Sequence, residues 1–135
     1  MALTPEEWVR QNFTSFLINY CSFPASLMGN EISIALNGMT RRCDTVVYSR
    51  NLRPLVIVEY KAPTVPITHK TLTQACTYNL VLRVPYIMMS NGLTHYCCHI
   101  DYVSNTYTYL RDVPSYSDIL AGAGAPPQAP NPYAT

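Results

Sequence analysis

The stretch from Leu55 to Pro63 constrains the fold more than any other part of the chain. It begins with four consecutive apolar residues, a pattern typical of a β-strand that is buried on both faces. The strand then ends in two opposite charges, Glu59 and Lys61, which side-chain alternation places on one face about 7 Å apart. Because charges at the end of an apolar strand cost free energy unless something compensates them, we expect the chemistry of the protein here.

Length and composition indicate one folded domain. The chain has 135 residues, of which 48% are hydrophobic and 13% are charged. So little charge in a domain of this size favours a mostly buried sheet. From residue 121 the chain consists largely of Ala, Gly, Pro and Gln without periodicity. We therefore expect a folded domain over residues 1–120 and a disordered tail over residues 121–135.

The charge and the cysteines bear on partners and location. A net charge of +1 gives no overall attraction to nucleic acid, so DNA binding would depend on a local basic patch. The five cysteines include no CxxC pair, and the N-terminus lacks the apolar core of a signal peptide. No segment approaches the roughly 20 apolar residues that span a bilayer. We expect a cytoplasmic protein with free thiols and no membrane partner.

The first half of the chain predicts a helix followed by three antiparallel strands. Thr4 can cap a helix that runs to about residue 20, with Pro5 at its first position and Glu7 completing a capping box. Alternation of apolar residues and turn signals then predict the strands. Their expected ranges are residues 31–36, 43–48 and 55–61, the last being the stretch described above.

The second half predicts a crossover to a parallel strand. Thr68 can cap a second helix that ends near residue 83. A strand, a helix and another strand in succession imply parallel pairing and a right-handed connection. The strands expected after this helix cover residues 86–89, 93–102 and 106–110.

The pairing of the second and third strands can be predicted from their hairpin. A four-residue loop over residues 50–53 pairs Tyr48 with Leu55, Val46 with Ile57, and Asp44 with Glu59. Directly opposed side chains lie about 5 Å apart, and two carboxylates so placed repel one another. They would bind a divalent cation between them, or one of them would stay protonated.

The ordered set of these residues resembles the PD-(D/E)XK nuclease superfamily. It is similar in particular to the N-terminal nuclease domain of type I restriction enzyme R subunits, on the segments Arg42 to Val47 and Val56 to Pro63. The similarity continues through Gln74-x-x-x-Tyr78 and the segment Ser90 to Leu93, and covers roughly residues 4–112. Cys43 stands where the superfamily name has a proline, and we expect no motor region within these 135 residues.

The resemblance implies a restriction-endonuclease-like α/β fold with a mixed central sheet flanked by two helices. The sheet would consist of a three-strand antiparallel meander joined by a crossover helix to a parallel strand. The implied cofactor is Mg²⁺ or Mn²⁺, held by Asp44, Glu59 and the backbone carbonyl of Tyr60.

The same resemblance assigns roles to the remaining candidates. Lys61 would complete the catalytic set by orienting a water or stabilising charge on the phosphate. An outer acid that binds the ion through water would be Glu7, with Glu31 in reserve. Two residues would flank the site, Gln74 and Tyr78, and two would contact DNA, Arg41 and Arg42.

Simpler explanations exist for several of these residues. Glu7 can serve only to cap the first helix. Gln74 and Tyr78 can be the polar flank of a packed helix, and surface arginines are more often simply exposed to solvent. The cluster from His95 to His99 invites a zinc site or a cysteine nucleophile. Alternation along a strand, however, sends Cys97 and Cys98 to opposite faces.

Two functions therefore follow from the sequence. The first is a metal-dependent endonuclease that hydrolyses DNA phosphodiester bonds. The second is a catalytically silent domain of the same fold that serves as a DNA-binding or scaffold module of a larger complex. The presence of Asp44, Glu59 and Lys61 together favours the first. Because the overall charge is so small, we expect a homodimer or companion subunits to enlarge the DNA contact.

Overall fold

The computed structural model describes residues 3–36 and 38–124, with the side chains at positions 36, 39, 78, 80 and 81 left out. Within these ranges the chain forms three α-helices and six strands. The helices are α1 (Pro5–Tyr20), α2 (His69–Leu82) and α3 (Tyr116–Gly122), and a 3₁₀ turn covers Ala25–Leu27. The strands are β1 (Met28–Leu36), β2 (Met39–Tyr48), β3 (Pro54–Tyr60), β4 (Tyr86–Ser90), β5 (His95–Asp101) and β6 (Thr106–Leu110).

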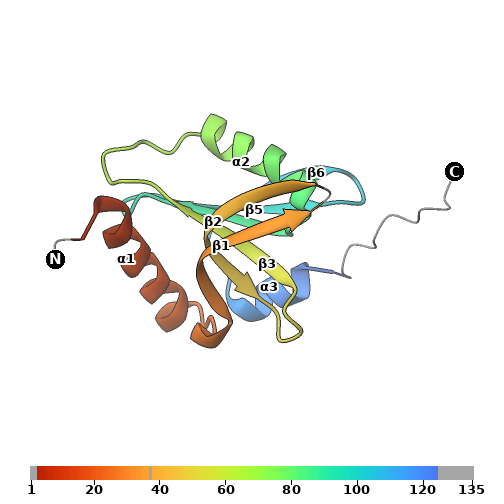
Figure 1. Cartoon of the computed structure of the whole chain (residues 1–135), viewed down its shortest axis with the longest axis horizontal. Helices are drawn as coiled ribbons and strands as arrows, with labels where there is room; N and C mark the ends of the chain where they lie inside the picture. Colours follow the sequence, from red (N-terminus) through yellow and green to blue (C-terminus); the bar gives the residue numbers. More distant parts are fainter. Residues whose placement is uncertain (1–2, 37, 125–135) are drawn as a thin grey trace, which may run out of the picture.

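The six strands form one mixed sheet in the order in which they occur along the chain. All neighbouring pairs are antiparallel except β3 and β4, which are parallel and are connected through α2. Figure 1 shows α2 on one face of the sheet and α1 with α3 on the other. The mixed α/β sheet predicted from the sequence is thus confirmed, with its meander and its parallel crossover.

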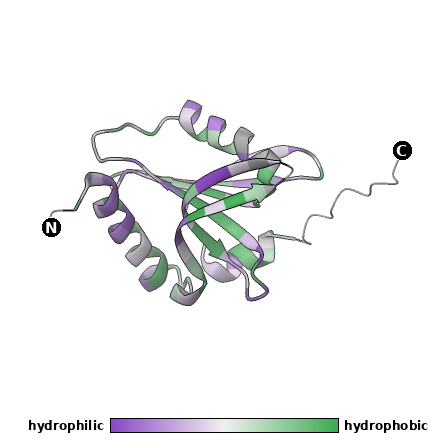
Figure 2. Cartoon of the chain, viewed as in Figure 1, coloured by the Kyte–Doolittle hydropathy of each residue, from purple (hydrophilic) through white to green (hydrophobic). Residues whose placement is uncertain are grey.

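Each face of the sheet carries its own hydrophobic core. The cluster on the α1 and α3 side contains Phe13, Val58 and Ile119, and the cluster on the α2 side contains Ile57 and Leu72. Because Val56 and Val58 enter one cluster and Ile57 enters the other, this strand is buried on both faces, as its apolar run predicts. Figure 2 shows the strands at the centre of the molecule mostly in the hydrophobic colour.

The predicted helix caps are present. Thr4 accepts a hydrogen bond from the backbone N–H of Glu7 at 3.2 Å, and Pro5 takes the first position of α1. Thr68 caps α2 in the same way, accepting from the N–H of Thr71 at 3.3 Å. Among the described residues, none of the helices has the length and apolar content needed to cross a membrane.

The predicted register of β2 and β3 is confirmed along most of the hairpin and is wrong at its end. Val46 pairs with Ile57 as expected. Tyr48, however, pairs with Pro54 instead of Leu55, because the register shifts by one residue after Val47. The loop explains the shift: the N–H of Ser49 already donates to Arg53 at 2.9 Å, which closes a tighter turn and leaves Leu55 as an extra residue in β3.

The third helix was not predicted, and it extends into the segment assigned to the tail. Its C-terminal end is held by side chains from the sheet. The Arg53 guanidinium donates to the carbonyls of Ala123 and Gly124 at 3.1 and 2.9 Å, and Nε2 of His99 lies 2.8 Å from the carbonyl of Gly122. These contacts satisfy carbonyls that a helix end leaves open. Residues 125–135 of the predicted tail lie outside the described residues.

The double burial of β3 gives a direct stability prediction. Ile57 has 0% exposure and pairs with Val46 on one side and Ile87 on the other. Replacing it by alanine leaves a cavity in a packed layer, and we expect Ile57→Ala to lower the free energy of unfolding by about 2–5 kcal/mol. Chemical denaturation measures this change.

The matched control is Val103→Ala, at a side chain that is 98% exposed. This substitution should change the free energy of unfolding by less than about 0.5 kcal/mol. Equal losses for the two variants would contradict the placement of β3 at the centre of the core.

Candidate active site

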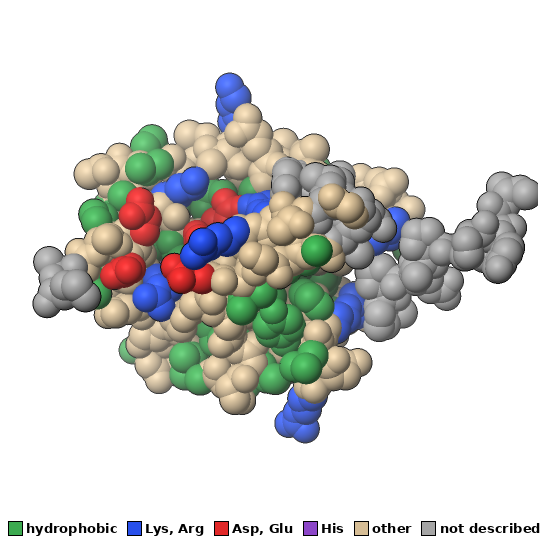
Figure 3. Space-filling model, viewed as in Figure 1, with side chains coloured by type: hydrophobic (Ala, Val, Ile, Leu, Met, Phe, Trp, Pro, Cys, Tyr) green, Lys and Arg blue, Asp and Glu red, His purple; other side chains and the backbone are tan. Residues whose placement is uncertain are grey.

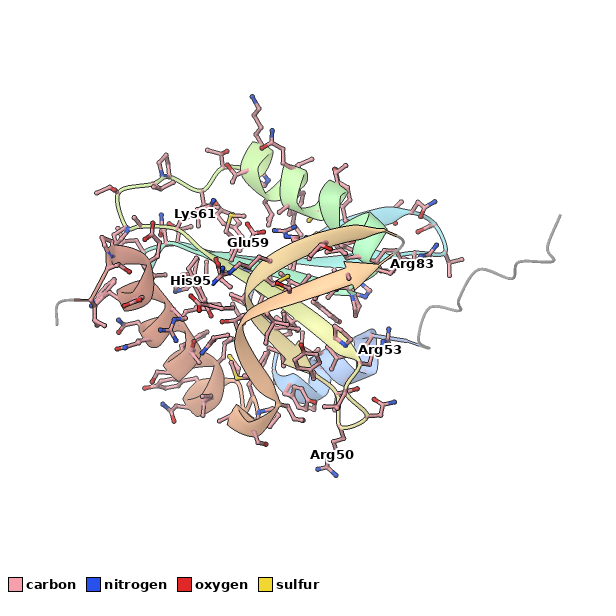
Figure 4. All side chains as sticks on the ribbon, viewed as in Figure 1. Arg50, Arg53, Glu59, Lys61, Arg83 and His95 are labelled. Carbon is pink, nitrogen blue, oxygen red and sulfur yellow. The ribbon has the colours of Figure 1, made fainter. Side chains whose placement is uncertain are left out.

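The end of strand β3 and the residue that follows it place Glu59 and Lys61 in a hollow beneath α2. This α2-side hollow, of about 360 Å³, brings together Glu59, Lys61 and Gln74, which were predicted to share a site. Figure 4 shows Glu59 and Lys61 at one end of the sheet, with Arg50 and Arg53 toward the other end. The full lining comprises Arg41, Glu59, Lys61, Thr71, Gln74, Ala75 and Met89.

An ion pair holds the carboxylate of this hollow. The guanidinium of Arg41, from β2, contacts Oε1 of Glu59, and the two side chains are only 14% and 17% exposed. A partly buried carboxylate without a partner would lose much of its hydration free energy, and Arg41 compensates this loss. Arg41 was predicted from the sequence to contact DNA, and that contact stays a prediction. In the free protein its guanidinium is instead a partner of Glu59.

Asp44 lines a second hollow, on the side of α1. This α1-side hollow of about 270 Å³ also contains Glu7 and Glu31, the two candidates for an outer acidic residue. Figure 3 shows acidic and basic side chains gathered over the N-terminal end of α1 and the neighbouring strands. The lining residues are Glu6, Glu7, Arg10, Glu31, Asp44 and Tyr60.

Asp44 and Glu59 therefore line separate hollows, although they lie on the directly paired strands β2 and β3. The pairing of β2 with β3 stays in step through Thr45 and Val58, which places Asp44 opposite Glu59 along the chain. The Asp44 carboxylate, however, accepts the backbone N–H of Tyr60 at 3.0 Å. The direct opposition expected for the two carboxylates is thus not seen at their side chains.

The cause is a local irregularity in β2. Cys43 and Val46 both enter the core cluster on the α2 side, although regular alternation would separate residues three apart. On the neighbouring strand, Glu31 has a φ of +54°, a left-handed conformation that residues other than glycine rarely adopt. Glu31 falls opposite Asp44 in the register, so the two strands depart from ideal geometry at the same level. This departure turns Asp44 toward α1.

A chain of hydroxyl groups supports the strand residues next to both carboxylates. The buried Tyr60 hydroxyl donates to Oγ1 of Thr45 at 2.8 Å and lies 3.3 Å from the hydroxyl of Thr14 on α1. Thr45 in turn donates to Oδ1 of Asn30 at 2.8 Å. Burial raises the pKa of Tyr60, so its hydroxyl keeps its proton as a donor. The chain links α1, β3, β2 and β1 beneath Asp44. Tyr60 was predicted from the sequence only as a backbone ligand, and this network of side chains was not predicted.

A serine and a histidine lie on the other side of Lys61. Oγ of Ser90 is 2.6 Å from Nδ1 of His95 and accepts the N–H of Gly92 at 3.0 Å. The carbonyl of Ser90 accepts the N–H of Lys61 at 2.9 Å. Which of the two side chains donates depends on the tautomer of the neutral imidazole, because the serine hydroxyl can donate one hydrogen bond and accept two. This arrangement fixes the backbone that carries Lys61.

The remaining predicted residues take more ordinary positions. Arg42 forms a pair with Glu31 at 3.4 Å, with side chains 68% and 74% exposed, so this is a surface contact. The side chain of Tyr78 lies outside the described residues, although its backbone belongs to α2. Cys97 and Cys98 enter the two opposite core clusters, as strand alternation predicts.

The donors at the end of β3 fit a hard divalent cation by their chemistry. Asp44, Glu59 and the carbonyl of Tyr60 supply only oxygen ligands, which magnesium and manganese prefer. The guanidinium against Glu59 shows that a positive charge is accommodated at this carboxylate. In residues 3–36 and 38–124, no three His, Cys, Asp or Glu side chains are grouped closely enough to hold a metal. In the described conformation Asp44 and Glu59 also line separate hollows, so a single ion would reach both only after one of the carboxylates turned.

Comparisons with known proteins point in one direction. The model of a family described as type I restriction enzyme R protein N terminus matches residues 5–114. A solved fragment of a protein described as an HsdR subunit of a type I restriction enzyme, from Vibrio vulnificus YJ016, is similar with a TM-score of 0.59 and 20% identity. The similarity covers 91% of this chain and 26% of that one, and at this identity it shows the fold alone. No curated protein matches the chain.

The environment of His95 predicts a pH dependence of stability. Its ring packs against Phe13 and Phe16, with centroids 4.8 and 6.0 Å away, and the resulting desolvation lowers the pKa of His95. The unfolded chain therefore binds this proton more readily than the folded protein does. Stability from the neutral ring should be present above pH of about 6.5 and should fall as the pH drops below that value.

The test is urea denaturation of wild type and His95→Gln between pH 7.5 and pH 5.5. The difference in the free energy of unfolding between the two proteins should shrink toward the acid end, because the variant has no proton to take up. A difference that stays constant across the range would show that His95 does not titrate with folding.

Proposed function

Because the chain belongs to the family of type I restriction enzyme R protein N termini, we propose that it cleaves DNA phosphodiester bonds with a bound divalent metal ion. The observation that carries this proposal is the α2-side hollow. It brings together Glu59 at the end of β3, Lys61 directly after that strand, and Gln74 from α2. A hollow lined by such polar side chains suits the binding of a polar ligand.

The metal ion would be held by Asp44, Glu59 and the carbonyl of Tyr60, for which the Asp44 carboxylate would have to leave the Tyr60 N–H and turn toward the α2-side hollow. When bound there, Mg²⁺ or Mn²⁺ would polarise the scissile phosphate and lower the pKa of an attacking water. The task of the protein is to hold the ligands in place. Glu59 and Tyr60 are consecutive residues at the end of the buried strand β3, which fixes two of the three ligands relative to one another.

Lys61 would supply a positive charge at the reacting phosphate. Its backbone N–H donates to the carbonyl of Ser90, which fixes the backbone from which the lysine side chain extends into the hollow. In the charged form it would stabilise the negative charge that develops on the phosphate oxygens. Gln74, on the opposite wall, would orient the DNA backbone or the lysine through its amide.

Two further contacts belong to the same proposal. Glu7, in the α1-side hollow with Asp44, would bind the ion through a water molecule. Arg42, on the surface beside the site, would contact a neighbouring DNA phosphate. Because the net charge is only +1, we propose that companion subunits or a second copy of the chain enlarge the DNA contact.

The proposal is tested by incubating plasmid and single-stranded DNA with the purified protein and Mg²⁺ or Mn²⁺. We expect cleavage by the wild type and a loss of about 10²–10³-fold in rate for Lys61→Ala, because an electrostatic contact to the transition state is removed. Asp44→Asn and Glu59→Gln should lose activity as well, through their weaker binding of the metal.

The matched controls are Lys70→Ala and Asp112→Asn, whose side chains are exposed and line neither hollow. Both should keep the wild-type rate. Cleavage that survives Lys61→Ala unchanged, or no cleavage with either metal at high protein concentration, would contradict the nuclease proposal.

A second candidate function is a DNA-binding or scaffold module without turnover. The observation that favours it is that both carboxylates already have partners, Glu59 in Arg41 and Asp44 in the Tyr60 N–H. This alternative predicts DNA binding that is independent of metal and unaffected by Asp44→Asn. Fluorescence anisotropy with labelled DNA, in the presence of a chelator and of Mg²⁺, separates the two functions.

A further inference from the structure

The two arginines that follow one another in β2 form very different ion pairs. The Arg41–Glu59 pair is almost enclosed, with side chains 14% and 17% exposed, whereas the Arg42–Glu31 pair is open to solvent. Exposed pairs are weakened by water and salt, and largely enclosed pairs are weakened much less. The ion pair of Arg41 with Glu59 should therefore be stable in the free protein. Arg42, the next residue, provides a control arginine with an exposed ion pair.

In the free protein, the α2-side hollow has a net positive charge, which favours binding of an anion. Its charged lining residues are two cations, Arg41 and Lys61, and one carboxylate, Glu59. A divalent cation that approached Glu59 would meet both positive side chains, and it would have to compete with a guanidinium already in contact with the carboxylate. The free protein should bind a metal ion weakly at this position.

A DNA phosphate in the hollow would favour metal binding there. A guanidinium can bind a phosphate through two parallel N–H donors, as well as it binds a carboxylate. A phosphate that entered the hollow between Arg41 and Lys61 would compete for the guanidinium and release Glu59. The negative charge of the phosphate would also cancel part of the repulsion felt by the metal ion.

We propose that Arg41 exchanges partners, holding Glu59 in the free protein and a DNA phosphate in the complex, so that metal binding depends on DNA. This inference rests on the proposed function, because it assumes that Glu59 is a metal ligand. Arg41 is then a positioning residue that delays assembly of the metal site until DNA is present. By thermodynamic linkage, the metal must strengthen DNA binding by the same factor as DNA strengthens metal binding.

The experiment is calorimetric titration of Mg²⁺ into the full chain, with and without a short duplex whose linkages are cleavage-resistant phosphorothioates. For the wild type, the duplex should tighten metal binding by a factor within the usual range for coupled sites, about 5–150-fold. For Arg41→Gln, metal binding without DNA should be at least about fivefold tighter than in the wild type. The effect of the duplex on this variant should shrink below about twofold.

The control variant is Arg42→Gln, which removes the neighbouring exposed pair and should keep the wild-type dependence on DNA. Glu59→Gln should abolish the tight metal binding in every case. If Glu59 proves to be a ligand but Arg41→Gln binds metal without DNA no better than the wild type, the exchange is overturned while the proposed function stands. If the wild type binds no metal with or without the duplex, or binds it equally well after Glu59→Gln, the proposed function fails and the exchange with it.

Removing Arg41 leaves Glu59 without its ion-pair partner, which could itself change metal binding. A variant that keeps the positive charge therefore provides a second test of the exchange. In Arg41→Lys the ammonium group can still pair with Glu59 but lacks the two-pronged donor geometry for phosphate. We expect its metal binding without DNA to match the wild type and the tightening by the duplex to be smaller. An unchanged tightening in Arg41→Lys would overturn the exchange.

Discussion

The structure depends on one strand that must be apolar along its length and charged at its end. Strand β3 lies between β2 and β4 and is covered by helices on both faces, so no polar side chain is tolerated in its middle. Its first opportunity for charge is at Glu59, where α1 and α2 leave hollows on either side. The fold thus concentrates charged groups at one end of the sheet, where a ligand can reach them.

The carboxylates of Asp44 and Glu59 both have partners, and those partners explain the local geometry. Arg41 compensates Glu59, and the Tyr60 N–H compensates Asp44. Two carboxylates that would repel one another across neighbouring strands are thereby kept in separate hollows without a bound metal. The arrangement stabilises the free protein and, by the same contacts, opposes the entry of a cation. Under the proposed exchange of partners, Arg41 would contribute both to the stability of the free protein and to the control of metal binding.

The sequence predicted the frame of the fold but not the side-chain partners of the site. Burial of β3 and its register with β2 followed from apolar runs and a hairpin length, which are local properties. Helix α3 was missed because Arg53 and His99, distant in sequence, satisfy its end. The partner of Glu59 could not be predicted, because alternation in β2 fails near Asp44 and a periodic pattern assumes that it holds.

The most direct test of the account is the position of a bound metal ion. A crystal of the chain grown with Mn²⁺ and a short cleavage-resistant duplex would show the ion by its anomalous scattering. The account predicts one ion in contact with Glu59, Asp44 and the carbonyl of Tyr60, with the Arg41 guanidinium on a DNA phosphate. An ion held by Glu6, Glu7 or Glu31 alone, with Arg41 still on Glu59, would contradict it.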